Sequence, residues 1–314
     1  MSEISRLSAI DLLAAYRTKT LSPVDVVRDA LARIDRFEPA VNAFTIVDRD
    51  GALALAKASE ARWSKGEPMG DADGIVTTIK SNIATKGWPA RRGSTTIGDQ
   101  PVQDDAPVVA NLRRAGCIFI GQTTMPEFGW IGVTHSRLSG ITRNPWNASR
   151  TPGGSSGGAA AAAALGIGSF HVGTDGAGSI RIPAAFSGLF GIMPPVGRVP
   201  AYPASPFGVL ARVGPLTRKV DDGALMLKIM AGTDTRDIAH DGHNPPDYAA
   251  ALTKGLRGLR IGWSPTLGFV DKLHPDVLAA TEKAARRLTE FGALVSDADP
   301  GFSREAAYGP LRVL

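Results

Sequence analysis

The sequence predicts an α/β fold in which helices cover a largely buried sheet. Short β-branched or apolar runs alternate along the chain with segments of helical spacing, and this order is typical of that class. The 314 residues are 43% hydrophobic and 21% charged, which is enough apolar material for a core. Internal repeats and heptads are absent from the sequence, so repeat architectures and coiled coils are not expected.

Several segments are predicted to be helical. Ser22 and Pro23 form a helix start, with Ser22 as the N-cap and Pro23 in the first helical position. Apolar residues then recur at helical spacing at Val24, Val27, Leu31 and Ile34. Further helices are expected over residues 50–64, over 106–114 with Asp105 as a cap, over 159–164, over 221–230 and after His274-Pro275.

The predicted strands lie between these helices. GIVTTIK (residues 74–80) is short and β-branched, and CIFIGQT (117–123) is an apolar run. Three more strands are expected at GSFHVGT (168–174), LRIGWS (259–264) and ALVSDA (293–298). The polar, proline-bearing segment 232–248 is the best linker candidate, and we expect it to cross a surface rather than to divide two domains.

Composition excludes several classes of function. The net charge is +5, but the basic pairs lie far apart and only 6% of residues are aromatic, so no nucleic-acid partner is expected. Cys117 is the single cysteine, in the apolar run GCIFIG, where we expect a buried structural thiol. The first 17 residues read as an amphipathic helix, and no stretch suits a membrane span, which favours the cytoplasm.

A glycine-rich stretch with two serines precedes a run of six alanines. Alanine is the best helix former, so Gly153–Gly158 forms a loop leading into a closely packed helix N-terminus, where developing negative charge is stabilised. A second small-residue stretch, Gly173–Ser179, follows a predicted strand and lets backbone N–H groups converge as an oxyanion hole requires.

Other interpretations of these loops are weaker. The spacings of phosphate-binding loops are absent, and so are metal-ligand spacings, so neither a nucleotide cofactor nor a metal is expected. A serine nucleophile needs a base. His171 lies in a predicted strand and is expected to be a core residue, while His135 lies in a loop that could line a pocket. No histidine has the partners of a Ser-His-Asp triad.

The stretch GGSSGGAAAAAALGIGSFHVGTDGAGSIRIPAAFSGLFGIMP resembles the signature region of the amidase signature family. The 24 positions between Ser155 and Ser179 match the spacing of that family's two serines, and GIVTTIKSNIATKGWPARRGS resembles its catalytic-lysine segment. The resemblance extends from about Ile10 to about Asp297. It implies a mixed sheet covered by helices on both faces, incomplete here at the C-terminus.

The resemblance also implies residue roles in amide hydrolysis without a cofactor. Ser179 is the expected acyl-forming nucleophile, Lys80 the base, and Ser155, following a cis peptide bond, the bridge between them. A supporting role falls to Ser156, Asp175 and Arg181, although Asp175 and Arg181 could equally form an ion pair without a part in the chemistry. The expected oxyanion hole consists of the N–H groups of Gly176, Ala177, Gly178 and Ser179. Two positions depart from the family's usual residues: Ser81, often acidic, and Ala177, often glycine.

The resemblance implies one amidase signature domain over residues 1–314. Its parts would be an N-terminal helical region to about residue 70, a catalytic core over about 71–232, and a truncated C-terminal part over about 233–314. The expected partner is a small-molecule amide, with no membrane or direct nucleic-acid contact, and a homodimer is left open. The alternatives are an A-type subunit of a glutamine-dependent tRNA amidotransferase and an inactive truncated remnant.

Overall fold

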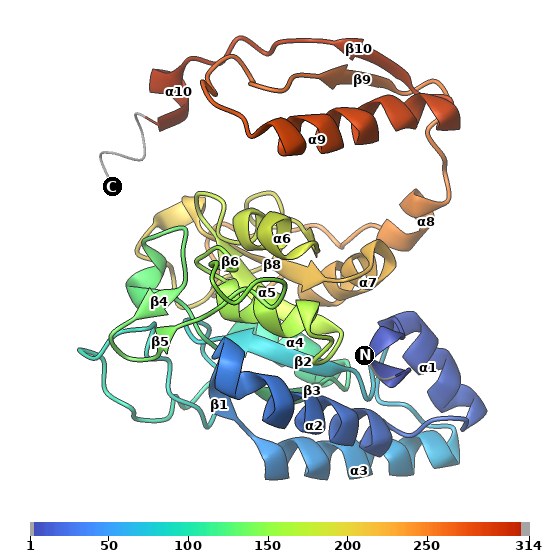
Figure 1. Cartoon of the computed structure of the whole chain (residues 1–314). Coiled ribbons are helices and arrows are strands. Elements are labelled where there is room, and N and C mark those ends of the chain that lie inside the picture. The colour runs from blue at the N-terminus through green and yellow to red at the C-terminus, as the bar shows by residue number, and fades with distance from the viewer. Residues whose placement is uncertain (1–2, 309–314) are drawn as a thin grey trace. The chain divides into compact units, whose positions relative to one another are not determined.

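A six-stranded mixed sheet surrounded by helices is the main feature of the computed structural model, which describes residues 3–308 (Figure 1). This confirms the predicted α/β fold. The chain divides into two compact units, Met1–Tyr248 and Ala249–Leu314. The division falls at the end of the polar segment 232–248. No helix among residues 3–308 combines the length and the apolar character that crossing a membrane requires.

The large sheet lies in the first unit, with the strand order β1-β3-β2-β6-β8-β7. The central strand β2 runs parallel to both its neighbours, β3 and β6, while β1, β8 and β7 pair antiparallel. The strands are β1 (Phe44–Val47), β2 (Val76–Lys80), β3 (Ile118–Thr123), β6 (Phe170–Asp175), β7 (Phe190–Gly191) and β8 (Arg212–Thr217). A small hairpin of β4 (His135–Ser136) and β5 (Gly140–Ile141) stands apart from it.

The helices of the first unit pack around this sheet. Ser22 caps its helix and Pro23 occupies the first position, as predicted. The helices are α1 (Ala9–Thr18), α2 (Pro23–Val41), α3 (Arg49–Lys65), α4 (Pro107–Arg114), α5 (Gly157–Ala164), α6 (Arg181–Ser187) and α7 (Val220–Met230), with single 3-10 turns at Ile4–Arg6, Glu127–Gly129 and Gly208–Leu210. Helix α5 lies against β2, β3, β6 and β8.

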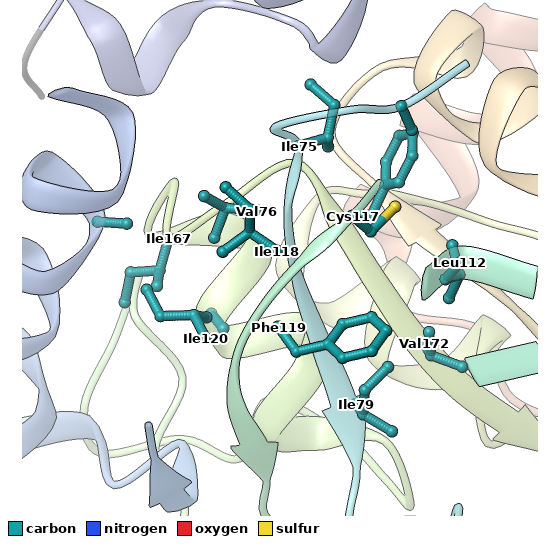
Figure 2. Packing of buried hydrophobic residues seen from close by; sticks show 14 of the residues in the cluster. Ile75, Val76, Ile79, Leu112, Cys117, Ile118, Phe119, Ile120, Ile167 and Val172 are labelled. Carbon is teal, nitrogen blue, oxygen red and sulfur yellow. The ribbon is translucent and has the colours of Figure 1, made fainter. Parts of the chain in front are cut away.

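The core of the first unit forms around β2 and β3, in which every residue is buried. Figure 2 shows part of it, with Ile79, Phe119 and Val172 among the packed side chains. Cys117 belongs to this cluster, and burial raises the pKa of its thiol to about 12. The prediction of a buried structural thiol is therefore confirmed.

One local prediction was wrong, and two elements were not predicted. Asp105 does not cap α4; Ala106 occupies that position, and the Asp105 carboxylate instead accepts from Lys86 N and pairs with Arg113. Strand β8 was missed because Pro215 lies within it and cannot donate a ladder hydrogen bond. Helix α6 was missed inside the glycine- and proline-rich signature region.

The second unit contains a parallel pair of strands and a helix. Strand β9 (Arg260–Trp263) pairs with β10 (Leu294–Asp297). The two strands lie within the predicted segments 259–264 and 293–298. Helix α9 (Pro275–Arg287) begins after His274, whose Nδ1 accepts from Asp276 N. The remaining elements are α8 (Tyr248–Leu252), which crosses the division, a 3-10 turn at Leu288–Phe291, and α10 (Arg304–Tyr308).

Candidate active site

One edge of the sheet gathers the residues singled out in the sequence. Lys80 is the last residue of β2, and Thr174 and Asp175 are the last two of β6. Because these strands are parallel neighbours, their carboxyl ends meet at the same edge. Helix α5 begins at Gly157, so Ser155 and Ser156 reach this edge from the loop before it.

The Lys80 amine is surrounded by three hydroxyl groups. Its Nζ lies 2.7 Å from Ser155 Oγ, 2.9 Å from Ser156 Oγ and 2.9 Å from Thr174 Oγ1. The side chain is 0% exposed, although lysine is among the residues that are most rarely buried. No carboxylate forms a salt bridge with this amine among residues 3–308. The ammonium form therefore has no direct counter-charge.

Burial changes the charge state of Lys80. It lowers the pKa of Lys80 from 10.5 to about 7, because the ammonium loses its hydration while the neutral amine loses little. The negative charge of Asp175 acts in the opposite direction and is the weaker influence. Near neutral pH a large fraction of Lys80 is consequently the free amine, which can accept a proton.

The serine loop is held by close backbone packing. The Gly154–Ser155 peptide bond is cis, as the family resemblance implied. A Cβ at Gly154 would lie 2.7 Å from backbone atoms of Val133, and one at Gly158 would lie 2.5 Å from Ala43 O. The glycines therefore permit a tight turn and the close approach of α5 to the sheet, rather than flexibility.

Asp175 organises the loop that carries Ser179. Its carboxylate accepts from Gly178 N at 2.6 Å and Ile180 N at 3.1 Å, and pairs with Arg181 Nε at 2.9 Å. Burial alone would raise the pKa of Asp175, but Arg181 and these N–H groups hold it below its usual value. The carboxylate stays charged and fixes the turn.

The structure brings Ser179 beside the Lys80 cluster through the backbone. Ser156 N donates to Ser179 O at 3.1 Å, and Ser156 Oγ donates to Thr174 O at 3.2 Å. Among residues 3–308, no hydrogen bond joins Ser179 Oγ to Ser155 Oγ. Such contacts in free enzymes are often long and tighten only with substrate.

The four backbone N–H groups of Gly176–Ser179 differ in whether they already donate a hydrogen bond. Those of Gly176, Ala177 and Ser179 make no hydrogen bond to another described residue, and Ala177 is exposed. The Gly178 N–H is different because it already donates to Asp175. Including Gly178 in the expected oxyanion hole is therefore corrected: its N–H is engaged in holding the turn.

Two residues at the site were not foreseen from the sequence. Thr174 Oγ1 accepts from Lys80 and also from Asn82 Nδ2 at 3.1 Å, while Asn82 Oδ1 is buried without a partner among residues 3–308. No single stretch of sequence signals their place at the site, because it follows from the pairing of Ile79 with Val172, which puts Thr174 near the end of β2.

Neither His171 nor His135 forms a hydrogen bond with Lys80, Ser155 or Ser179 among the described residues. His171 is 1% exposed in β6, its Nδ1 lies 2.9 Å from Thr78 Oγ1, and burial lowers its pKa to about 3. This confirms the expectation of a core residue. His135 is exposed in the β4–β5 hairpin. Among residues 3–308, His, Cys, Asp and Glu side chains nowhere form a group of three that could hold a metal ion.

Comparison with known proteins agrees with this geometry. The sequence matches the family described as Amidase over residues 25–307. The chain belongs to the amidase signature family. Among curated relatives of this family, an acylamidase of Rhodococcus erythropolis is 39% identical over 94% of this chain and 62% of its own length. The A-type subunit of the glutamyl-tRNA(Gln) amidotransferase of Chloroflexus aurantiacus is 38% identical over 98% of this chain and 63% of its own.

A solved amidase signature structure is also similar. It is a bacterial aryl acylamidase, with a TM-score of 0.86 and 34% identity, covering 95% of this chain and 62% of that one. The chain thus spans about three fifths of the length of the amidase signature proteins that it matches.

Proposed function

We propose that the protein hydrolyses a carboxylic amide to a carboxylate and ammonia or an amine, through an acyl-enzyme on Ser179. The observation that carries this proposal is the fully buried Lys80 amine, 2.7 Å from Ser155 Oγ and with a pKa lowered by burial to about 7. A lysine in this state is a base rather than a cation near neutral pH. Ser155 and Ser179 then become the next two members of a proton relay.

The hydrogen bonds around Lys80 support this direction of proton transfer. A neutral amine has two N–H donors and one lone pair, and three hydroxyls surround it. The Ser156 proton points to Thr174 O, so Ser156 accepts from Lys80. Thr174 Oγ1, which Asn82 also contacts, takes the second N–H. The lone pair then faces Ser155, whose hydroxyl has no other partner among residues 3–308.

The proposed reaction moves one proton in each direction along this relay. Ser179 Oγ bonds to the amide carbon while its proton passes to Ser155 and the Ser155 proton passes to Lys80. As the C–N bond breaks, the relay returns a proton to the leaving nitrogen. Water then attacks the acyl-enzyme by the same relay and releases the carboxylate.

The negative charge that develops on the carbonyl oxygen needs donors that are already in place. We assign this role to the N–H groups of Gly176, Ala177 and Ser179, which are not engaged elsewhere among residues 3–308. One such donor typically lowers the barrier by about 2.7–4 kcal/mol. The Asp175–Arg181 pair supports this arrangement by fixing the turn, and Ser156 supports it by binding both Lys80 and Thr174.

Two measurements on the 314-residue chain test the proposal. Ammonia release is measured over aliphatic, aryl and amino-acid amides, and a small fluorophosphonate is used to label the nucleophile. We expect Ser179→Ala to abolish both, and Lys80→Ala and Ser155→Ala each to remove most of the rate. Hydrolysis that survives Ser179→Ala would refute the site, and a folded chain that neither reacts nor labels would indicate an inactive remnant.

A second function has a specific observation in its favour. A relative that is 38% identical to this chain is the A-type subunit of a glutamyl-tRNA(Gln) amidotransferase. For this chain, the corresponding function would be to pass ammonia from glutamine to an acyl acceptor. Glutaminase activity that rises when partner subunits are added would favour that function. Activity on simple amides that does not depend on a partner would favour the hydrolase.

The remaining expectations are proposals with their own tests. We place the catalytic core at about residues 71–232, which contain every proposed catalytic residue, within one amidase signature domain. Light scattering tests the homodimer, and cell fractionation tests the cytoplasmic location.

A further inference from the structure

Two aromatic rings stack on each other at the protein surface. The centroids of Trp130 and Phe207 are 5.7 Å apart and their planes differ by 18°. Although stacked, the Trp130 side chain is still 60% exposed. The two residues are 77 positions apart in sequence and come from separate loops. Phe207 is only partly exposed, so the accessible part of the stack is mainly the indole ring of Trp130, a flat apolar surface available to a ligand.

The loop of Trp130 runs directly along the proposed relay. A Cβ at Gly129 would lie 3.1 Å from Ser155 Oγ, so the backbone before Trp130 borders the bridging serine. A Cβ at Gly132 would lie 3.6 Å from Ile182 Cδ1, in the helix that follows the nucleophile. Trp130 therefore lies between two points that contact the site.

The segment of Phe207 also borders the site. It continues through the turn Gly208–Leu210 into β8. A Cβ at Gly176 would lie 3.8 Å from Ala211 Cα and 3.9 Å from Leu210 O, so this segment borders the proposed oxyanion hole. The stack thus connects a loop beside Ser155 with a segment beside Gly176. Two further exposed apolar residues, Ile131 and Val209, lie within two positions of Trp130 and Phe207 in the sequence.

We propose that Trp130 and Phe207 form a subsite that binds an aromatic ring of the amide substrate. This inference rests on the proposed amidase function and adds the class of substrate: amides that carry an aryl group within reach of the carbonyl. A flat ring can stack on Trp130 beside Phe207 while the amide carbon lies near Ser179. A saturated ring of similar size lacks the π-face that makes such stacking favourable.

Binding to a chain that cannot turn over tests the subsite directly. In Ser179→Ala, calorimetric titration compares benzamide with cyclohexanecarboxamide, which has a saturated ring. We expect benzamide to bind about 2- to 12-fold more tightly, the range that ring stacking supplies. Trp130→Ala and Phe207→Ala should each remove this preference, while Trp130→Phe should retain most of it. Met69→Ala is the control, since Met69 is 55% exposed near the opposite end of β2.

The outcomes separate the subsite from the proposed function. Equal binding of the two amides, no detectable binding of benzamide, or a preference that persists in both alanine variants would overturn the subsite. Fluorophosphonate labelling of unmodified Ser179 reports on the nucleophile independently. Labelling without a ring preference refutes the subsite alone, whereas a ring preference without labelling refutes the proposed nucleophile and supports the subsite.

Discussion

Replacing Lys80 by methionine should change how the stability of the protein depends on pH. Methionine has a similar length and carries no charge. The substitution also leaves Ser155, Ser156 and Thr174 without their shared donor, so its effect at one pH combines several contributions. The change of stability with pH is specific to the amine, because the hydroxyls do not titrate in this range.

The magnitude follows from the two pKa values of Lys80. The pKa is about 7 in the folded chain and 10.5 for an ordinary lysine, so between these values the unfolded chain binds more protons. The free energy of unfolding therefore rises with pH in this window. At 1.36 kcal/mol per pH unit, we expect a gain of about 3 kcal/mol from pH 6 to pH 9 in the wild type relative to Lys80→Met.

Urea unfolding at pH 6, 7, 8 and 9, at constant ionic strength, measures this difference. Other groups titrate equally in both proteins and cancel. Lys228→Met is the matched control: Lys228 lies at the surface against Asp71, which raises its pKa, so its difference curve should be flat. A flat curve for Lys80→Met as well would mean that Lys80 stays an ammonium when folded, and the proposed base would be lost.

Three further outcomes are expected. For the amide hydrolysis, kcat/KM should rise as pH increases through about 7, where Lys80 loses its proton, and a profile that falls with pH over this range would contradict its role as base. Thr174→Val removes one acceptor of the ammonium form, so we expect kcat/KM to fall about tenfold and the midpoint of its pH profile to move to lower pH; an unmoved midpoint would limit Thr174 to a packing role. Asp175→Asn weakens the pairing with Arg181, which is half-exposed, and should lower the free energy of unfolding by roughly 1–3 kcal/mol in urea titrations; an unchanged urea midpoint would contradict this.

Local patterns in the sequence were sufficient for much of the fold. Ser22-Pro23 identifies a helix start because a capping hydroxyl and a fixed proline φ act within one turn. The β-branched run that ends at Lys80 likewise marks β2 and its last residue. These signals depend on neighbouring residues alone, and so they were readable without knowledge of the rest of the chain.

The missed strand and the wrong helix cap both depended on distant partners. Strand β8 contains Pro215, which argues against an interior strand, yet β8 lies between β6 and β7. Its pairing is compatible because the Pro215 carbonyl still accepts from Ile192 N. Asp105 is of a residue type that often caps helices, but its carboxylate instead pairs with Arg113, eight residues further along the chain. A sequence pattern does not reveal which of two available partners a carboxylate takes.

The surroundings of Lys80 show most clearly what the sequence could and could not provide. The resemblance identified the lysine and serines, because a long signature fixes their spacing. Thr174 and Asn82 became visible only when β2 and β6 were found to be parallel neighbours that end at the same edge. Their position matters to the chemistry: Thr174 takes one N–H of the proposed neutral amine, which helps to direct the lone pair toward Ser155. Which way Lys80 can move a proton is thus determined by strand pairing, a property that no single stretch of sequence contains.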